Sequence, residues 1–208
     1  MNKNRGVFSY GGLLLDKKMH AIIKSSGKMQ LSKKLQIEYG KTKKRIDSFK
    51  YYLGHTQAPT SSERTFTPKT SHPFSFKDWH VAHNGVLTNY KQLCQLLSKK
   101  SYNAVDTSVI PPLLDQAYKQ TKDEIAAIRH VLGALQGTFG LWIYNHKTHN
   151  IYIARSGSTI YADFLTNSFS SIKHDTFHEL EEGLIYLITP EGITSVGKFI
   201  PNSPFFTK

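Results

Sequence analysis

Ten histidines and one cysteine are the first side chains of this 208-residue sequence to consider as nucleophiles, bases or metal ligands. The cysteine, Cys94, lies in a leucine-rich segment with helical spacing, which favours a small buried side chain over a nucleophile. His80 and His83 lie three residues apart in an apolar segment typical of a strand, so their side chains should point to opposite faces. We therefore expect no metal site and no cofactor. A single cysteine also excludes an internal disulfide and a cysteine-rich zinc site.

Short polar motifs occur at intervals between the apolar segments. In chain order they are residues 54–60 (GHTQAPT), 71–74 (SHPF), 83–89 (HNGVLTN), 105–108 (VDTS), 135–140 (LQGTFG), 154–158 (ARSGS), 169–171 (FSS) and 180–183 (LEEG). Their histidine, asparagine, aspartate and arginine side chains can supply hydrogen bonds and charges of both signs. Asn84 and Gly85 form a typical turn sequence, which predicts that the short strand at 80–83 ends there.

The elements that would position these motifs are strands, then helices, then strands. Strand patterns cover residues 7–15, 51–56, 80–83, 139–144, 151–154, 184–189 and 193–199, and helical spacing covers 93–97, 109–117 and 125–135. This order favours an α+β layered domain over a parallel βαβ sheet. No repeat or linker divides the sequence. We therefore expect a single domain over residues 1–208, with a basic stretch at 17–50 and little regular structure at 16–48.

Composition excludes several classes of protein. Apolar residues make up 39% and aromatic residues 12% of the chain, which is too much for a disordered or fibrous protein. No run approaches the ~20 apolar residues that a membrane helix needs. The start of the sequence lacks the long apolar core of a signal peptide. We expect a cytoplasmic protein with no membrane partner, or one in the host cytoplasm if the source is a phage.

Positive charge is concentrated at the start of the chain. The formal net charge is +12, and residues 1–50 hold 13 Lys and Arg residues against three acidic ones. A local positive field of this kind favours encounters with polyanions such as nucleic acids. The candidate contact residues are Lys33, Lys34, Lys41, Lys43, Lys44 and Arg45. The alternative is a solvated lysine-rich face that keeps the protein soluble, since no nucleic-acid-binding motif accompanies it.

Taken together in this order, the motifs resemble those of the class II glutamine amidotransferases, whose glutaminase domain is an N-terminal nucleophile hydrolase. The resemblance covers nearly the whole chain and implies an α+β fold, a four-layer αββα sandwich. It implies a cysteine nucleophile whose own α-amine acts as the base. It also implies two donors that stabilise an oxyanion, and an arginine and an acid that bind the carboxylate and ammonium of glutamine.

Two of these parts are replaced in this sequence. The family's opening Cys-Gly-Ile-Phe-Gly is matched by RGVFS, which puts Arg5 at the nucleophile position, inside the chain. Gln57 takes the place of the carboxylate-binding arginine, and a neutral amide cannot replace a bidentate guanidinium. The oxyanion pair Asn84 and Gly85 is kept, as is the acid, Asp106. The resemblance places the former substrate pocket at His55, Gln57, Thr60, His83 and Asp106.

The loss of the cysteine predicts a catalytically inactive relative that acts by binding a protein partner, an anionic ligand or a nucleic acid. Arg5 would then neutralise Asp106 or bind an anion. Alternatively, Asn84, Gly85 and Asp106 are kept only as turn and packing residues. A second possible function is an active amidotransferase or amide hydrolase that supplies ammonia in trans, with a nucleophile exposed by processing. A third is a polyanion-binding module that uses the basic N-terminal quarter.

Overall fold

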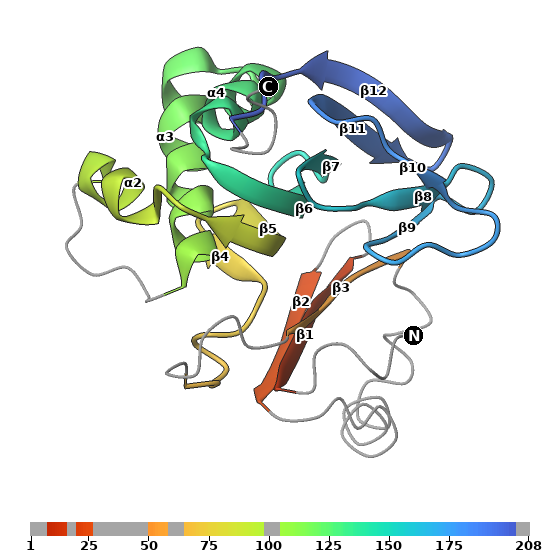
Figure 1. The fold of residues 1–208 in the computed structure, drawn as a ribbon, viewed down its shortest axis with the longest axis horizontal. Helices are drawn as coiled ribbons and strands as arrows, with labels where there is room; N and C mark the ends of the chain where they lie inside the picture. The colour runs from red at the N-terminus through yellow and green to blue at the C-terminus, as the bar shows by residue number, and fades with distance from the viewer. Residues whose placement is uncertain (1–7, 16–19, 27–49, 58–64, 98–104, 203–208) are drawn as a thin grey trace. The chain divides into compact units, whose positions relative to one another are not determined.

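The computed structural model describes residues 8–15, 20–26, 50–57, 65–97 and 105–202 (Figure 1). The chain divides into two compact units, Met1–Pro73 and Phe74–Lys208. The expectation of a single domain over the whole sequence stays a prediction. No helix within the described ranges is long and apolar enough to cross a membrane.

The first unit contains an antiparallel sheet of three strands in the order β2-β1-β3. The strands are β1 (Ser9–Leu15), β2 (His20–Ser26) and β3 (Tyr51–Gln57). Gly12 and Gly54 are cross-strand partners, and a Cβ on Gly12 would lie 2.5 Å from the ring of Tyr52. Two residues without side chains therefore make room for one aromatic ring on this face of the sheet.

Strand β2 corrects the expectation of little regular structure at 16–48. Its Ile22 and Ile23 supply β-branched side chains and pair with residues of β1. With β3 on its other side, β1 has a neighbour for the N–H and C=O groups along both of its edges. Lysines around this short segment mask its strand pattern in the sequence. The strands expected at 7–15 and 51–56 are confirmed as β1 and β3.

The second unit is built on an antiparallel sheet of six strands in the order β12-β11-β7-β6-β5-β4. Their bounds are β4 (Phe74–Phe76), β5 (Trp79–Leu87), β6 (Gly137–Asn145), β7 (Ile151–Ser156), β11 (Leu184–Thr189) and β12 (Gly192–Lys198). Strands β5 and β6 pair along their whole lengths, from Trp79 opposite Asn145 to Leu87 opposite Gly137. The strands expected at 139–144, 151–154, 184–189 and 193–199 are confirmed, the one expected at 80–83 is longer in the structure, and the three-residue β4 was missed.

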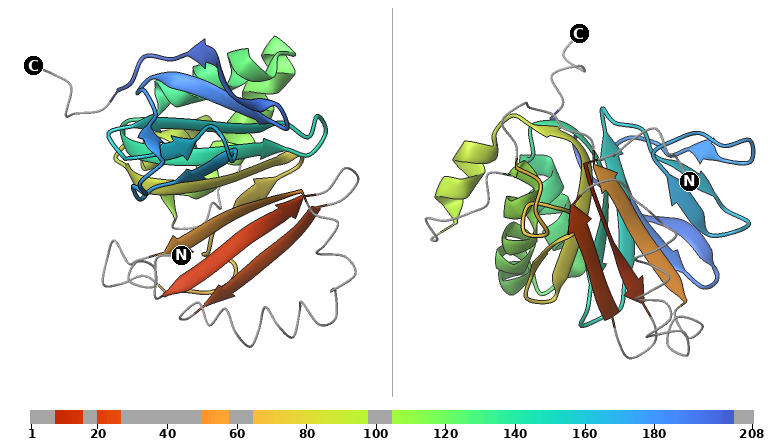
Figure 2. Two further views of the ribbon diagram at one scale, coloured as in Figure 1. Left: turned by 90° about the vertical axis from the view of Figure 1, so that its right-hand side faces the viewer. Right: turned by 90° about the horizontal axis from the view of Figure 1, so that it is seen from below.

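Within the described residues, helices fill the chain between β5 and β6. They are α2 (Tyr90–Leu96), the 3-10 helix η1 (Asp106–Val109), α3 (Ile110–Thr121) and α4 (Glu124–Ala134). Helix α3 has prolines in its first turn, and the Asp123 carboxylate caps α4 by accepting a hydrogen bond from the Ala126 N–H at 2.9 Å. Helices α3 and α4 cover one face of the six-stranded sheet (Figure 2), and their apolar side chains form the core of this unit. The three expected helices are confirmed.

A small antiparallel sheet in the order β10-β8-β9 completes the second unit. Its strands are β8 (Tyr161–Asp163), β9 (Ser168–Ser170) and β10 (His178–Glu179). The Asp163 carboxylate accepts a hydrogen bond from the Leu165 N–H of the β8–β9 turn at 2.9 Å and one from the Thr176 hydroxyl, between β9 and β10, at 3.0 Å. Strands of two or three residues are too short to show a period, which is why the sequence did not predict them.

Candidate functional site

Asn84 and Gly85 lie inside strand β5, and the expectation that they end a strand in a turn is wrong. The strand continues to Leu87 because Gly85 adopts a φ of 141° while it stays paired with Phe139 of β6. A Cβ at Gly85 would lie 2.1 Å from the Thr138 carbonyl oxygen. Only glycine meets both conditions without strain. The sheet itself therefore fixes the backbone beside Asn84.

The side chain of Asn84 lies on the face of the sheet away from the helices. Side chains alternate along a strand, and Val81 and Leu87 of β5 are buried in the core that α3 and α4 cover. Asn84 has the opposite parity and is exposed. Its side chain forms no hydrogen bond with another described residue. The strand backbone thus sets the position of an exposed amide.

The carboxylate of Asp106 is fixed at the end of β5. One oxygen, Oδ2, accepts a hydrogen bond from the Leu87 N–H at 2.9 Å, and the other, Oδ1, accepts one from the Thr107 N–H at 2.8 Å. The side chain remains 23% exposed. Asp106, on η1, therefore bonds the β5 residue that lies two positions after Gly85, so Asp106, Asn84 and Gly85 lie in one region of the second unit.

His83 is a buried link between β5, η1 and β6. Its Nε2 lies 3.1 Å from the Thr138 carbonyl oxygen and its Nδ1 lies 3.1 Å from the Thr107 hydroxyl. Burial lowers the pKa of His83, although the nearby charge of Asp106 and the Thr138 carbonyl oppose that shift. In the neutral ring, Nε2–H donates to the carbonyl and Nδ1 accepts from the hydroxyl. His83 thus supports the site from within the core.

The predicted pocket residues of the first unit lie on β3. Gln57 is buried, and its Oε1 accepts a hydrogen bond from the Ser9 hydroxyl at 2.8 Å. The ring of His55 packs against that of His72, with 4.0 Å between the ring centroids. A fixed, uncharged amide thus occupies the position where the sequence comparison expected an arginine. Ser9 is itself fully buried, and its hydroxyl is committed to Gln57.

Several predicted residues lie outside the described part of the chain. They are Arg5, Thr60 and the six candidate polyanion contacts Lys33, Lys34, Lys41, Lys43, Lys44 and Arg45. Among the described residues, no three His, Cys, Asp or Glu side chains are grouped so that they could hold a metal ion.

Two residues near the site were missed in the sequence. Asn89 is buried; its Nδ2 donates to the Ala134 carbonyl at 2.8 Å and its Oδ1 accepts from the Gln136 N–H at 3.0 Å. Its position at the end of the 83–89 motif was the available signal. Burial raises the pKa of Tyr90 to about 12, with smaller effects from a hydrogen bond with Cys94 and from the charge of Asp106. Cys94 itself is half-buried against the core, in line with its expected packing role.

Known proteins resemble this chain along most of its length. Residues 64–166 match a family described as a glutamine amidotransferase domain. The chain is 26% identical over 202 residues to a glutamine–fructose-6-phosphate aminotransferase of Francisella tularensis, covering 91% of this chain and 32% of that protein. It is 31% identical over 138 residues to the enzyme of the same name from Pseudomonas syringae, covering 60% and 23%. The chain spans about a third or less of the length of these relatives.

Solved structures share the fold. An allosteric regulatory enzyme of purine biosynthesis matches 93% of this chain with a TM-score of 0.70 and 19% identity, over 43% of its own chain. A glutamine phosphoribosylpyrophosphate amidotransferase from B. subtilis matches 93% with a TM-score of 0.66 and 19% identity, over 44% of its chain. The expected α+β class is confirmed, because the described residues form antiparallel sheets and helices and the chain shares its fold with these solved structures. The loss of catalysis stays a prediction.

Proposed function

We propose that this chain, which belongs to the class II glutamine amidotransferase family, is a catalytically inactive member that acts by binding. The proposal separates two halves of the family's site. The half that would bind the amide and the ammonium is present as Asn84, Gly85 and Asp106. The half that would supply the nucleophile and bind the carboxylate is replaced by Arg5 and Gln57.

The main support for this proposal is Gln57, an uncharged side chain at the position where the family has an arginine. The side chain is buried and carries no charge, and the hydrogen bond that it accepts from the Ser9 hydroxyl at 2.8 Å fixes its position. An arginine would offer a planar fork of charged donors that binds a carboxylate bidentately. A neutral amide leaves the carboxylate of glutamine without its opposite charge. Tight binding of glutamine and its positioning for attack would both be lost.

The position of Cys94, which carries the single thiol of the sequence, supports the same proposal. Cys94 is the single cysteine of the sequence, and it lies on α2, half-buried against the core of the second unit. A nucleophile needs exposure and an adjacent base. The resemblance would instead require the cysteine at position 5, where an arginine stands.

The test is ammonia release from L-glutamine by the purified chain, with its mass verified and an active relative as positive control. We expect no release above the buffer rate. Turnover by the wild-type chain that Asn84→Ala abolishes would overturn the proposal, and it would favour the alternative of an active enzyme that supplies ammonia in trans. A variant with Arg5→Cys and Gln57→Arg that lacks residues 2–4 measures how much of the site remains usable.

Net charge supports an anionic binding partner: a small anionic ligand, a nucleic acid or an acidic surface of a protein. Residues 1–50 carry 13 basic and three acidic side chains. Phosphate contacts release counterions, so binding to single-stranded DNA should weaken steeply as salt rises.

A charge-reversal experiment tests this partner class. The variant changes Lys41, Lys43, Lys44 and Arg45 to Glu, and the matched control changes four exposed lysines of the second unit, Lys91, Lys147, Lys173 and Lys198. We expect the first set to abolish retention on a DNA column and the second to weaken it only slightly. Equal losses would show that retention follows net charge alone rather than a basic site.

A further inference from the structure

Asn84 belongs to a cross-strand row of three residues on the face of the six-stranded sheet away from the helices. Gly140 of β6 pairs with Asn84 on one side and with Arg155 of β7 on the other. Residues opposite each other on adjacent strands are near neighbours on one face of a sheet. The glycine leaves a space between the asparagine and the arginine.

The side chain of Ile160 fills this space. A Cβ built on Gly140 would lie 3.0 Å from Ile160 Cγ1 and 3.3 Å from the Thr159 carbonyl oxygen. Ile160 is only 4% exposed, so its side chain is enclosed here. Ile160 comes from the segment between β7 and β8 and thus reaches the row from outside the sheet. Whatever fixes this segment also fixes the apolar surface beside Asn84.

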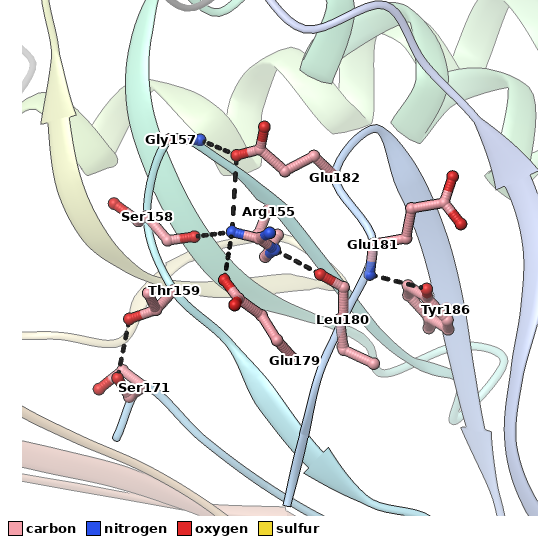
Figure 3. Close-up of polar contacts among 10 residues, drawn as sticks. All are labelled: Arg155, Gly157, Ser158, Thr159, Ser171, Glu179, Leu180, Glu181, Glu182 and Tyr186. Carbon is pink, nitrogen blue, oxygen red and sulfur yellow. Dashed lines mark hydrogen bonds and ion pairs between the residues drawn. The ribbon is translucent and has the colours of Figure 1, made fainter. Parts of the chain in front are cut away.

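Arg155 fixes the segment through four polar contacts (Figure 3). Its Nε donates to the Leu180 carbonyl at 2.5 Å, and its Nη1 donates to the Ser158 carbonyl at 3.1 Å. The same Nη1 lies 3.1 Å from Glu179 Oε1 and 3.5 Å from Glu182 Oε1. The Arg155 side chain is 14% exposed and that of Glu182 is 19% exposed, so this pair is more enclosed than an ordinary surface pair, whereas Glu179 is 45% exposed.

These contacts join two segments of the chain, 157–160 and 179–183. Glu182 Oε1 also accepts a hydrogen bond from the Gly157 N–H (Figure 3), and the Leu180 N–H donates to the Ile160 carbonyl at 2.9 Å. The guanidinium thus contacts both the segment that contains Ile160 and the segment that bonds the Ile160 carbonyl. Without it, Glu179 and Glu182 would lie close together with no cation between them.

We propose that Arg155 is a positioning residue for the Asn84 site: it holds the 157–160 segment so that Ile160 packs on Gly140, the strand neighbour of Asn84. The idea deepens the proposed function, because it identifies what shapes the surface next to the retained amide. An arginine with a purely structural role would stabilise the two segments without affecting Asn84. If Arg155 is a positioning residue, replacing it should move Ile160 and thereby change the surroundings of the Asn84 side chain.

The test is nuclear magnetic resonance of the 15N-labelled chain, read at the Asn84 side-chain amide and at the backbone amides of Gly85 and Gly140. Ile160→Ala removes the filling side chain but keeps every contact of Arg155, and Arg155→Gln removes the contacts themselves. Arg129→Gln is the matched control, because Arg129 is an exposed arginine of α4. We expect both test variants to shift and broaden the Asn84 signal, with no change in the control.

Arg155→Lys provides the rescue. A lysine keeps one positive charge for the two glutamates but has a single nitrogen, so it cannot reach both carbonyls as the guanidinium does. We expect a partial return of the wild-type Asn84 signal. An unchanged Asn84 signal in Ile160→Ala would overturn the proposal, even if Arg155→Gln failed to fold. The resonance measurement needs no ligand. Its failure can therefore be distinguished from a failure of the proposed function, which the glutamine assay tests.

Discussion

Gly85→Ala is the substitution that the backbone of the site should tolerate least. Alanine at a φ of 141° costs about 1–3 kcal/mol in backbone strain. Its Cβ would also lie 2.1 Å from the Thr138 carbonyl oxygen and 2.9 Å from His83 Nε2, and relieving such overpacking costs about 1–3 kcal/mol more. The expected total loss in the free energy of unfolding is about 2–6 kcal/mol.

A matched glycine separates the two contributions. Gly192 has a φ of 151°, and a Cβ there would have nothing within 4 Å, so Gly192→Ala should cost the strain alone, about 1–3 kcal/mol. Gly133 of α4 also has open space around its Cβ position, and Gly133→Ala should stabilise by up to about 1 kcal/mol. The three alanines thus predict an order of stabilities.

The assay is urea unfolding followed by tryptophan fluorescence. Both tryptophans, Trp79 and Trp142, are buried in the second unit, so the signal reports this unit. With a slope of about 2 kcal/mol per molar urea, Gly85→Ala should lower the midpoint by about 1–3 M. If Gly85→Ala and Gly192→Ala lowered it equally, the close approach to Thr138 would not matter. The argument that only glycine fits this strand would then be refuted.

Three further substitutions test the surroundings of the site. Burial lowers the pKa of His83 below its ordinary 6.5, so its contribution to stability should be complete above pH 6.5 and fall as the pH drops below it; His83→Gln should flatten this part of a urea-midpoint profile. Tyr152→Phe should cost about 1 kcal/mol by removing a 2.6 Å hydrogen bond to Glu124, and it should remove a loss of stability above pH 10, because burial and Glu124 raise the pKa of Tyr152. Asn89→Ala should cost about 1–3 kcal/mol in the same assay, because two part-buried backbone groups lose their hydrogen-bond partner. A loss below about 1 kcal/mol would mean that water replaces the amide.

Periodicity predicted the elements that are long and bury one face. Strands β6 and β7 were expected from apolar residues that alternate along a strand pair, and α4 begins with a capping Asp123 before an acidic first turn. Such patterns are local, so a sequence displays them directly. The short strands of the β10-β8-β9 sheet gave no such signal, and the lysines around β2 masked the pattern of Ile22 and Ile23.

The partners of the site residues could not be predicted, because they come from distant parts of the chain. Asp106 bonds the N–H of Leu87, 19 residues earlier, and His83 contacts Thr138, 55 residues later. Each contact depends on how η1 and β6 pack beside β5, and this packing is a property of the folded sheet that no local sequence pattern shows. The turn expected at Asn84 failed for a related reason. Asn-Gly is a typical turn sequence, whereas here the pairing with β6 carries the strand onward through both residues.

Asn84 distinguishes the two explanations for the residues that this chain keeps. Gly85 and Asp106 support the fold as well as a site, since one fits the sheet and the other bonds two backbone N–H groups. A fold can require such residues whether or not anything binds. Asn84 is exposed and its side chain bonds no other described residue, so the described contacts assign it no packing role.

The two explanations therefore make opposite predictions for Asn84→Ala. If the site binds a ligand through this amide, the variant should unfold within about 0.5 kcal/mol of the wild-type chain. It should also lose the resonance change that a small anion, with acetate or phosphate as the probe, causes at Gly85 of the wild-type chain. Val86→Ala is the control, because Val86 is 49% exposed two residues along the same face. A loss above 1 kcal/mol for Asn84→Ala would identify a packing residue, and the proposed binding function would then lose its structural support.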